Sequence, residues 1–333
     1  MRSIITHFDG DPFLLNFWLL LYEKYWRGEC DKIYVTICHD NAKLSPAIRD
    51  YNLRLLAKYP EIQVKSIMEI TPPEIGNEYS YKSGKGDEGL VGFIESDGFI
   101  FARGLVDQCF RLLEQGEDIV CPHWSLIDDP YVWSEFHHKG FMRCFFFSKR
   151  SLLDKIDMDF MPKDIKRGDI LPNSAAVHAD HDMPLDCFGW VSLQLAMLAP
   201  KVTFVPANVA HPDTIMNAAQ YEQWAWCHVR QMSSSALGFG GDEYYLWKNN
   251  APELHKRIMA LFNEGFPGGP AEFTYAKAIA FKLLFYDVMT DKAGIEDVAQ
   301  DYLTVLHAVA DVYNIPKGMI YEMKGFYRGL MKV

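Results

Sequence analysis

Short apolar runs alternate with helix-type periodicity along most of this 333-residue chain. The runs expected to form strands are Arg2–His7, Lys32–Cys38, Ile62–Ile67, Val91–Ser96, Asp118–Cys121, Met142–Phe147 and Val202–Val205. Between two of them, Leu105, Cys109 and Leu112 repeat with the period of a helix that faces a core. This alternation predicts an α/β fold, a mostly parallel sheet flanked by helices on both faces. In such sheets, ligands bind beyond the carboxyl ends of the strands.

Three segments between the strands have distinct local signals. Asp11–Arg27 is expected to be a helix that is apolar on nearly every side, which predicts deep burial. Ser45-Pro46 places an N-cap serine before a proline at the first helical position, so a second helix should begin there. Thr71–Gly92 contains five glycines and is predicted to form a mobile loop.

The composition changes at Gly265–Pro270, a cluster of glycine and proline that cannot continue a helix. We therefore expect an α/β domain over residues 1–215, an extension of helices and loops over 216–264, and a helical C-terminal region over 271–333. The C-terminal helices are the candidate surface for a homo-oligomer.

The charge balance and the cysteines limit the class of protein. Lys and Arg total 33 against 44 Asp and Glu, a formal net charge of −11. This argues against nucleic acid as a partner, because phosphate backbones are bound by clustered basic surface. The seven cysteines include no CxxC pair, which favours a reducing compartment. No segment reaches the roughly 18 apolar residues of a membrane span. We expect a soluble, cytoplasmic protein with no transmembrane segment.

The sharpest chemical feature is Glu95-Ser96-Asp97, two carboxylates at the end of an apolar strand. Burying uncompensated carboxylates is costly, so a strand that ends in them usually delivers them to water, a cation or a ligand. Oxygen ligands at this spacing suit Mg²⁺ or Mn²⁺, which also bind phosphate oxygens. The alternative for the tripeptide alone is a solvated turn in which Asp97 caps the next helix.

The order and spacing of several motifs resemble the GT-A glycosyltransferases, which use nucleotide-diphospho-sugars, over about Arg2 to Asp213. In this resemblance, Ile4–Gly10 corresponds to the opening strand and the loop that cradles the nucleotide. Asp40 corresponds to the acidic residue that ends the second strand and contacts the nucleoside. Glu95-Ser96-Asp97 corresponds to the family's DxD motif, with Glu in the first place.

Three later segments continue the resemblance. Phe145–Leu153 is similar to the hydrophobic strand that leads into the acceptor side. Asp186–Trp190 is similar to the acidic helix start that follows, with one acid where the family has two. Phe204–Pro206 and Val209–His211 match the ending whose histidine is a metal ligand in many family members.

The resemblance implies metal-assisted transfer of a hexosyl or pentosyl group from a nucleotide-diphospho-sugar, expected to be a UDP-sugar, to a hydroxyl of a glycan acceptor. The metal, Mn²⁺ or Mg²⁺, would be held by Asp97, Glu95 and His211. Asp186 is the implied catalytic base for the acceptor hydroxyl, and Lys85 is expected to reach a phosphate from the glycine-rich stretch. The full set expected to contact the nucleotide is His7, Phe8, Asp9, Gly10, Asp40, Glu95 and Lys85.

Two other functions stay open from the sequence. His178–Asp182 gathers metal-capable side chains and would make the protein a metal-dependent hydrolase, which zinc content and phosphodiesterase activity would favour. The other is an inert GT-A-derived scaffold that binds a partner through its helical C-terminus. Failure to bind any nucleotide with Mn²⁺ would favour that function.

Overall fold

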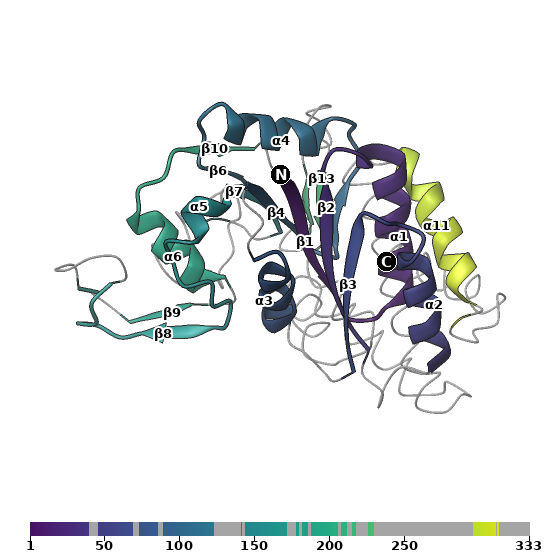
Figure 1. Cartoon of the computed structure of the whole chain (residues 1–333), viewed down its shortest axis with the longest axis horizontal. Helices are drawn as coiled ribbons and strands as arrows, with labels where there is room; N and C mark the ends of the chain where they lie inside the picture. The colour runs from purple at the N-terminus through teal and green to yellow at the C-terminus, as the bar shows by residue number, and fades with distance from the viewer. Residues whose placement is uncertain are drawn as a thin grey trace, which may run out of the picture.

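The computed structural model shows an α/β protein whose main sheet carries helices on both faces (Figure 1). The described residues are 1–39, 46–68, 73–85, 89–122, 141, 144–171, 178–179, 182–185, 188–205, 208–211, 215–217, 226–229, 296–310 and 312. The predicted fold class is therefore correct.

The main sheet has seven strands, and most of its neighbouring pairs are parallel. In spatial order the strands are β10 (Val202–Phe204), β6 (Ile119–Cys121), β7 (Phe145–Lys149), β4 (Leu90–Ile94), β1 (Arg2–Phe8), β2 (Lys32–Cys38) and β3 (Ile62–Ile67). Only β7 runs against its neighbours, and it is antiparallel to both β4 and β6. The carboxyl ends of β1, β2, β3 and β4 therefore meet at one edge of the sheet.

Two smaller sheets accompany the main one. An antiparallel sheet contains β11 (Asn208–His211), β12 (Ile215–Asn217), β13 (Trp226–Val229) and β5 (Gly98–Ile100), in that order. A hairpin of β8 (Lys163–Ile165) and β9 (Met183–Leu185) projects at the lower left of Figure 1.

Alternate residues of the central strands point to opposite faces, so the sheet separates two apolar cores. Ile4 belongs to the larger core and Ile5 to the smaller one. The larger core holds residues of α1 (Pro12–Leu21), the π-helical turn η1 (Tyr22–Trp26), α2 (Pro46–Leu56), α4 (Leu105–Glu114) and α11 (Glu296–Ala310). The smaller core holds residues of α3 (Pro73–Ser83), α5 (Arg150–Leu153) and α6 (Gly189–Met197).

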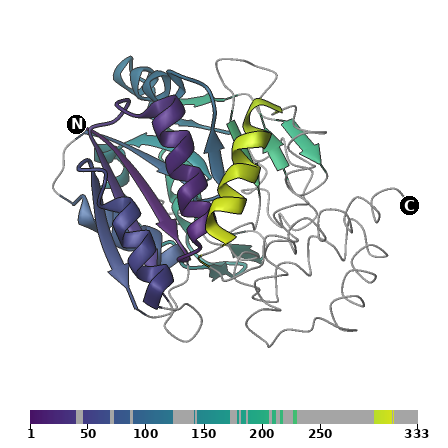
Figure 2. The ribbon, with the colours of Figure 1, turned by 90° about the vertical axis from the view of Figure 1, so that its right-hand side faces the viewer.

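Helix α1 is buried on nearly all sides, as its composition predicts. The Asp11 carboxylate accepts a hydrogen bond from the Phe13 backbone N at 3.0 Å, which caps the first turn. The outer side of α1 is covered by α11, which lies beside it (Figure 2). The ring of Tyr302 packs edge-on against Phe13 at 4.9 Å and Phe17 at 5.1 Å. A segment near the C-terminus thus completes the core around the first helix.

The mobile loop expected over Thr71–Gly92 is wrong, because α3 occupies Pro73–Ser83 within it. Two of its glycines permit close packing instead of flexibility. A Cβ at Gly76 would collide with the imidazole of His7, and a Cβ at Gly84 would lie 2.9 Å from Arg150 Nη2.

Among the described helices, none has the length and apolar character needed to cross a bilayer.

Tyr302→Ala should destabilise the protein by about 3–5 kcal/mol, because it leaves a large cavity between α1 and α11. Urea unfolding measures the free energy of unfolding. Thr304→Ser, on the exposed face of the same helix, keeps the hydroxyl, is the control and should change it by less than about 0.5 kcal/mol. Equal stability of the two variants would contradict the packing of α11 on α1.

Candidate functional site

Glu95-Ser96-Asp97 forms the short connection between β4 and β5, and so between the two larger sheets. The backbone N of Gly98 donates to Glu95 O at 2.9 Å and closes a β-turn. The backbone N of Glu95 donates to Cys144 O at 3.2 Å. A Cβ at Gly98 would lie 3.1 Å from that same Cys144 oxygen, so glycine suits the close approach. The turn fixes both carboxylates at the carboxyl end of β4.

His228 lies opposite this turn, because β13 pairs with β5 and places His228 in register with Gly98. Its Nε2 atom is 3.0 Å from Glu95 Oε2 and 3.3 Å from Asp97 Oδ1. The three side chains are 11%, 18% and 5% exposed, in the order His228, Glu95, Asp97. One ligand atom from each lies within 4.8 Å of the others. Two carboxylates and one imidazole are a donor set that can hold a divalent metal ion.

The two carboxylates change the protonation of His228. Burial alone lowers the pKa of this imidazole. The negative charge of Asp97 and hydrogen bonds to both acids outweigh that effect, and together they raise the pKa from 6.5 to about 9. At neutral pH without a metal, His228 is therefore a cation that balances one of the two negative charges. A metal ion would replace that proton, because only a neutral imidazole binds metal.

The sequence analysis missed His228. The strand Trp226–Val229 lies beyond the segment that resembles a known family, and its histidine belongs to no recognised motif. The available signal is local: Trp226 and His228 occupy alternate positions, so they share one side of β13. Trp226 is 1% exposed and stacks on Phe145 at 5.4 Å with an interplanar angle of 11°. This buried contact anchors the strand that presents His228.

The strand of His211 is separated from the strand of His228. Its backbone belongs to β11, and β12 lies between β11 and β13. Met216 of β12 pairs with Val209 on one side and with His228 on the other. The described residues do not test the sequence prediction for His211, and among them His228 is the histidine that lies beside the two carboxylates.

The loop after β1 brings together the residues expected to cradle a nucleotide. His7 is 4% exposed, lies against Gly76 of α3, and has its Nδ1 3.7 Å from Asp9 Oδ1. The ring of Phe8 packs edge-on against Trp18 at 5.6 Å and belongs to the core. Asp9 is 18% exposed, and Gly10 has a φ of +79°. Asp9 is therefore the more solvent-accessible residue of this loop, because Gly10 is buried.

His39 follows β2 at the same edge of the sheet. Its Nδ1 is 3.2 Å from Ser66 Oγ, and its Nε2 is 3.3 Å from Asn52 Nδ2. Burial, assisted by the nearby charge of Arg49, lowers the pKa of His39 to about 4. The imidazole is therefore neutral at physiological pH. Asp40, which comes next in the sequence, lies outside the described residues.

Lys85 lies at the opposite edge of the sheet from the carboxylates. Helix α3 begins beside His7, where Gly76 touches the imidazole, and ends beside Arg150 at Gly84. The backbone N of Arg150 donates to Gly89 O at 2.9 Å, just before β4 begins. The structure therefore does not bring Lys85 to Glu95 and Asp97.

Two other sequence candidates, His178 and Asp182, lie in the connection between β8 and β9. His178 Nδ1 is 2.8 Å from Gly168 O, and Asp182 Oδ1 accepts from the Arg167 backbone N at 2.8 Å. Both side chains are exposed, and within the described residues they join no group able to share a metal ion. Asp180, His181 and Asp186 lie outside the described residues.

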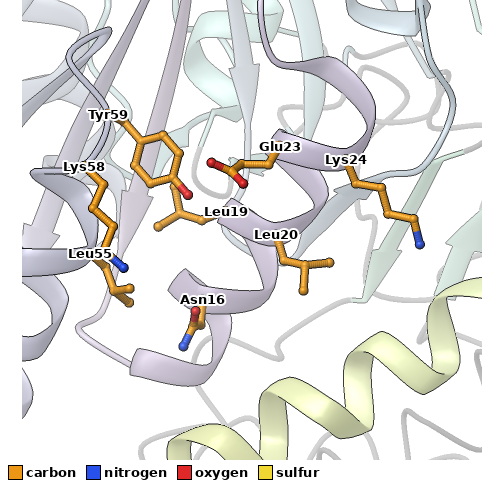
Figure 3. Close-up of a pocket in the computed structure, with 8 residues that line it drawn as sticks. All are labelled: Asn16, Leu19, Leu20, Glu23, Lys24, Leu55, Lys58 and Tyr59. Atoms are coloured by element: carbon orange, nitrogen blue, oxygen red, sulfur yellow. The ribbon is translucent and has the colours of Figure 1, made fainter.

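A hollow of about 450 Å³ lies elsewhere, between α1, η1 and the end of α2 (Figure 3). Its lining residues are Asn16, Leu19, Leu20, Glu23, Lys24, Leu55, Lys58 and Tyr59. Both helices run back from the carboxyl edge of the sheet, so this hollow lies towards the amino ends of the strands. It is separate from the Glu95–Asp97–His228 cluster.

No protein-family model and no curated protein matches the chain. Similar solved structures include the mannosyltransferase PcManGT from Pyrobaculum calidifontis, in complex with GDP-Man and Mn²⁺. It is 13% identical with a TM-score of 0.40, and the match covers 99% of this chain and 84% of that chain. TarS residues 1–349 from S. aureus, in complex with UDP-GlcNAc, are 13% identical with a TM-score of 0.42, covering 98% and 91%. These likenesses concern the course of the chain and say nothing about its activity.

A third similar structure is a 4-diphosphocytidyl-2C-methyl-D-erythritol synthase from Anaerococcus prevotii. It is 14% identical with a TM-score of 0.34, and the match covers 46% of this chain and 71% of that chain.

Acidification should destabilise the protein through His39. Because the folded pKa is about 4 and the ordinary value is 6.5, the unfolded chain gains a proton first as the pH falls. The native state therefore keeps its full stability with respect to His39 above about pH 6.5 and loses stability as the pH falls towards 4. Between pH 7 and 5, the free energy of unfolding of the wild type should fall by on the order of 1 kcal/mol more than that of His39→Gln, a figure reduced to allow for solvent screening. Urea unfolding at each pH provides the measurement, and parallel curves would contradict the neutral, buried imidazole.

Proposed function

We propose that this chain is a metal-assisted glycosyltransferase that moves a sugar from a nucleotide-diphospho-sugar, a UDP-sugar, to a hydroxyl of a glycan acceptor. The observation that carries the proposal is the Glu95–Asp97–His228 cluster at the carboxyl edge of the main sheet. In open α/β sheets this edge is where ligands bind. The order of motifs from Ile4 to His211 also supports the proposal.

Each part of the site has a separate role in this proposal. Glu95, Asp97 and His228 hold a divalent ion, Mn²⁺ or Mg²⁺, which when bound neutralises the diphosphate and so makes it a better leaving group. Asp9 contacts the nucleotide, and the buried Gly10 shapes the loop that carries Asp9. Asp40, next to His39 in the sequence, contacts the nucleoside.

The acceptor side is assigned to Asp186. The bond between the sugar's anomeric carbon and the phosphate oxygen breaks while the acceptor oxygen bonds to that carbon, and Asp186 takes the hydroxyl proton. Asp186 is two residues before Phe188, whose ring lies 6.2 Å from that of Phe93 in β4. Phe93 is itself two residues before Glu95. The contact between Phe188 and Phe93 brings the segment that follows Asp186 close to the end of β4, which supports the choice of Asp186 as the base.

Asp97→Asn should abolish Mn²⁺-supported UDP binding in a protein that still folds. The change removes a metal ligand while His228 keeps its contact with Glu95. A thermal-shift measurement can detect the loss, because a ligand at 100 Kd stabilises the native state by about 2.7 kcal/mol. Asp164→Asn, at the exposed residue of β8, is the matched control. Unchanged UDP affinity in folded Asp97→Asn would reject the metal site, and a wild type that binds no nucleotide would favour the inert scaffold.

Binding of Mn²⁺ at pH 7 should release about one proton, because His228 carries a proton up to about pH 9. Calorimetry in two buffers of different ionisation enthalpy measures this number. His228→Ala should bind Mn²⁺ at least about tenfold more weakly and release no proton. His211→Ala should behave as the wild type. The reverse pattern would make His211 the ligand and leave His228 as an ion-pair partner.

A further inference from the structure

Asn52 is a fully buried amide in the middle of α2, at 0% exposure. The buried residues of this helix are Ile48, Asn52 and Leu56, spaced by four. Asn52 therefore occupies the middle of the stripe that faces the core, where an apolar side chain is expected. Burying an amide costs free energy unless hydrogen bonds compensate it. The contacts of the side chain should therefore explain its presence.

Both hydrogens of the Asn52 amide are directed at the carboxyl edge of the sheet. Nδ2 donates to the Gly10 carbonyl oxygen at 2.7 Å and lies 3.3 Å from Nε2 of His39. The orientation of the amide is chemically determined, because a carbonyl oxygen can only accept and so must face the NH₂ group. Asn52 Oδ1 is buried and accepts no hydrogen bond from the described residues. The NH₂ group of Asn52 thus contacts Gly10 and His39 in two different loops, while its own oxygen has no hydrogen-bond partner among the described residues.

The two partners of Asn52 belong to neighbouring loops. Gly10 ends the loop after β1 in a left-handed conformation, and the next residue, Asp11, caps α1. His39 follows β2, and its backbone N donates to Ile67 O at 2.7 Å. Its ring reaches Ser66 in β3. One side chain of α2 therefore connects the ends of β1 and β2, and through His39 the end of β3.

We propose that Asn52 is a positioning residue that holds Gly10 after β1 and His39 after β2 in one fixed arrangement, and through them positions the nucleoside part of the donor. The second half of this statement rests on the proposed function. Asn52 has no accessible surface, so it acts through Gly10 and His39 and does not touch the ligand itself. A leucine would fill the stripe without an unsatisfied oxygen, so the amide is explained by its donors and not by packing.

The test compares Asn52→Leu and Asn52→Ala with the control Gln194→Leu. Gln194 is also a buried helical amide, at 4% exposure, whose Nε2 donates to Asp157 O at 2.8 Å, far from both loops. Asn52→Ala provides a second, helix-favouring change if the leucine does not fold. Two quantities are measured: amide hydrogen exchange in segments that contain Gly10 and His39, and the affinity for UDP with Mn²⁺. The affinity for Mn²⁺ alone is the internal reference.

Both Asn52 variants should increase exchange at Gly10 and at His39 together, with no increase in the Glu95–Gly98 turn. UDP affinity should fall about tenfold or more, equivalent to about 1.4 kcal/mol. Mn²⁺ affinity should stay at the wild-type value, and Gln194→Leu should change none of these quantities.

Three results would overturn the inference in different ways. A uniform rise in exchange over the whole sheet would mean that Asn52 acts only on global stability. Loosened loops with unchanged UDP affinity would reject the link to the nucleoside. If the wild type binds no nucleotide, the proposed function and that link both fail, and the exchange data still decide whether Asn52 couples the loops.

Discussion

Two carboxylates and one imidazole share a nearly buried position at the end of β4, and the rest of the site depends on their charges being balanced there. An unpaired buried carboxylate would lose several kcal/mol of hydration. The protonated His228 compensates one negative charge and leaves the other for a cation. The tight turn that ends in Gly98 and the register of β13 on β5 both serve this arrangement, since a shift of one residue would turn His228 to the other side of the sheet.

A second set of interactions holds the neighbouring loops. At the end of β1, Asp11 caps α1 while the preceding carbonyl of Gly10 accepts from Asn52. Tyr302 of α11 lies in the same region, where burial, together with the charge of Asp11, raises the pKa of its hydroxyl. Helices from both ends of the described chain therefore converge below the loop that is expected to receive a nucleotide. The neutral His39 extends this support to β2 and β3.

Local patterns allowed the fold to be predicted, because strand and helix periodicities depend on neighbouring residues. Ile62–Ile67 and the helix start at Pro46 agree with the structure to the residue. Helix α3 was missed because Gly76 and Gly84 resemble loop residues, although they are needed for contact with His7 and Arg150. His228 was missed for a different reason. Its place beside Glu95 results from strand pairing between distant segments, and no local pattern encodes that pairing.

The same distant pairing affects the order in which the molecule can assemble. All seven strands of the main sheet lie before residue 205, whereas β13 and α11 come later in the chain. During synthesis from the amino end, the scaffold strands are therefore made before the strand that brings the imidazole. Until Trp226 docks on Phe145, Glu95 and Asp97 have no basic partner from β13. The nascent chain thus passes through a stage in which the sheet can exist while its acidic turn stays open to solvent ions.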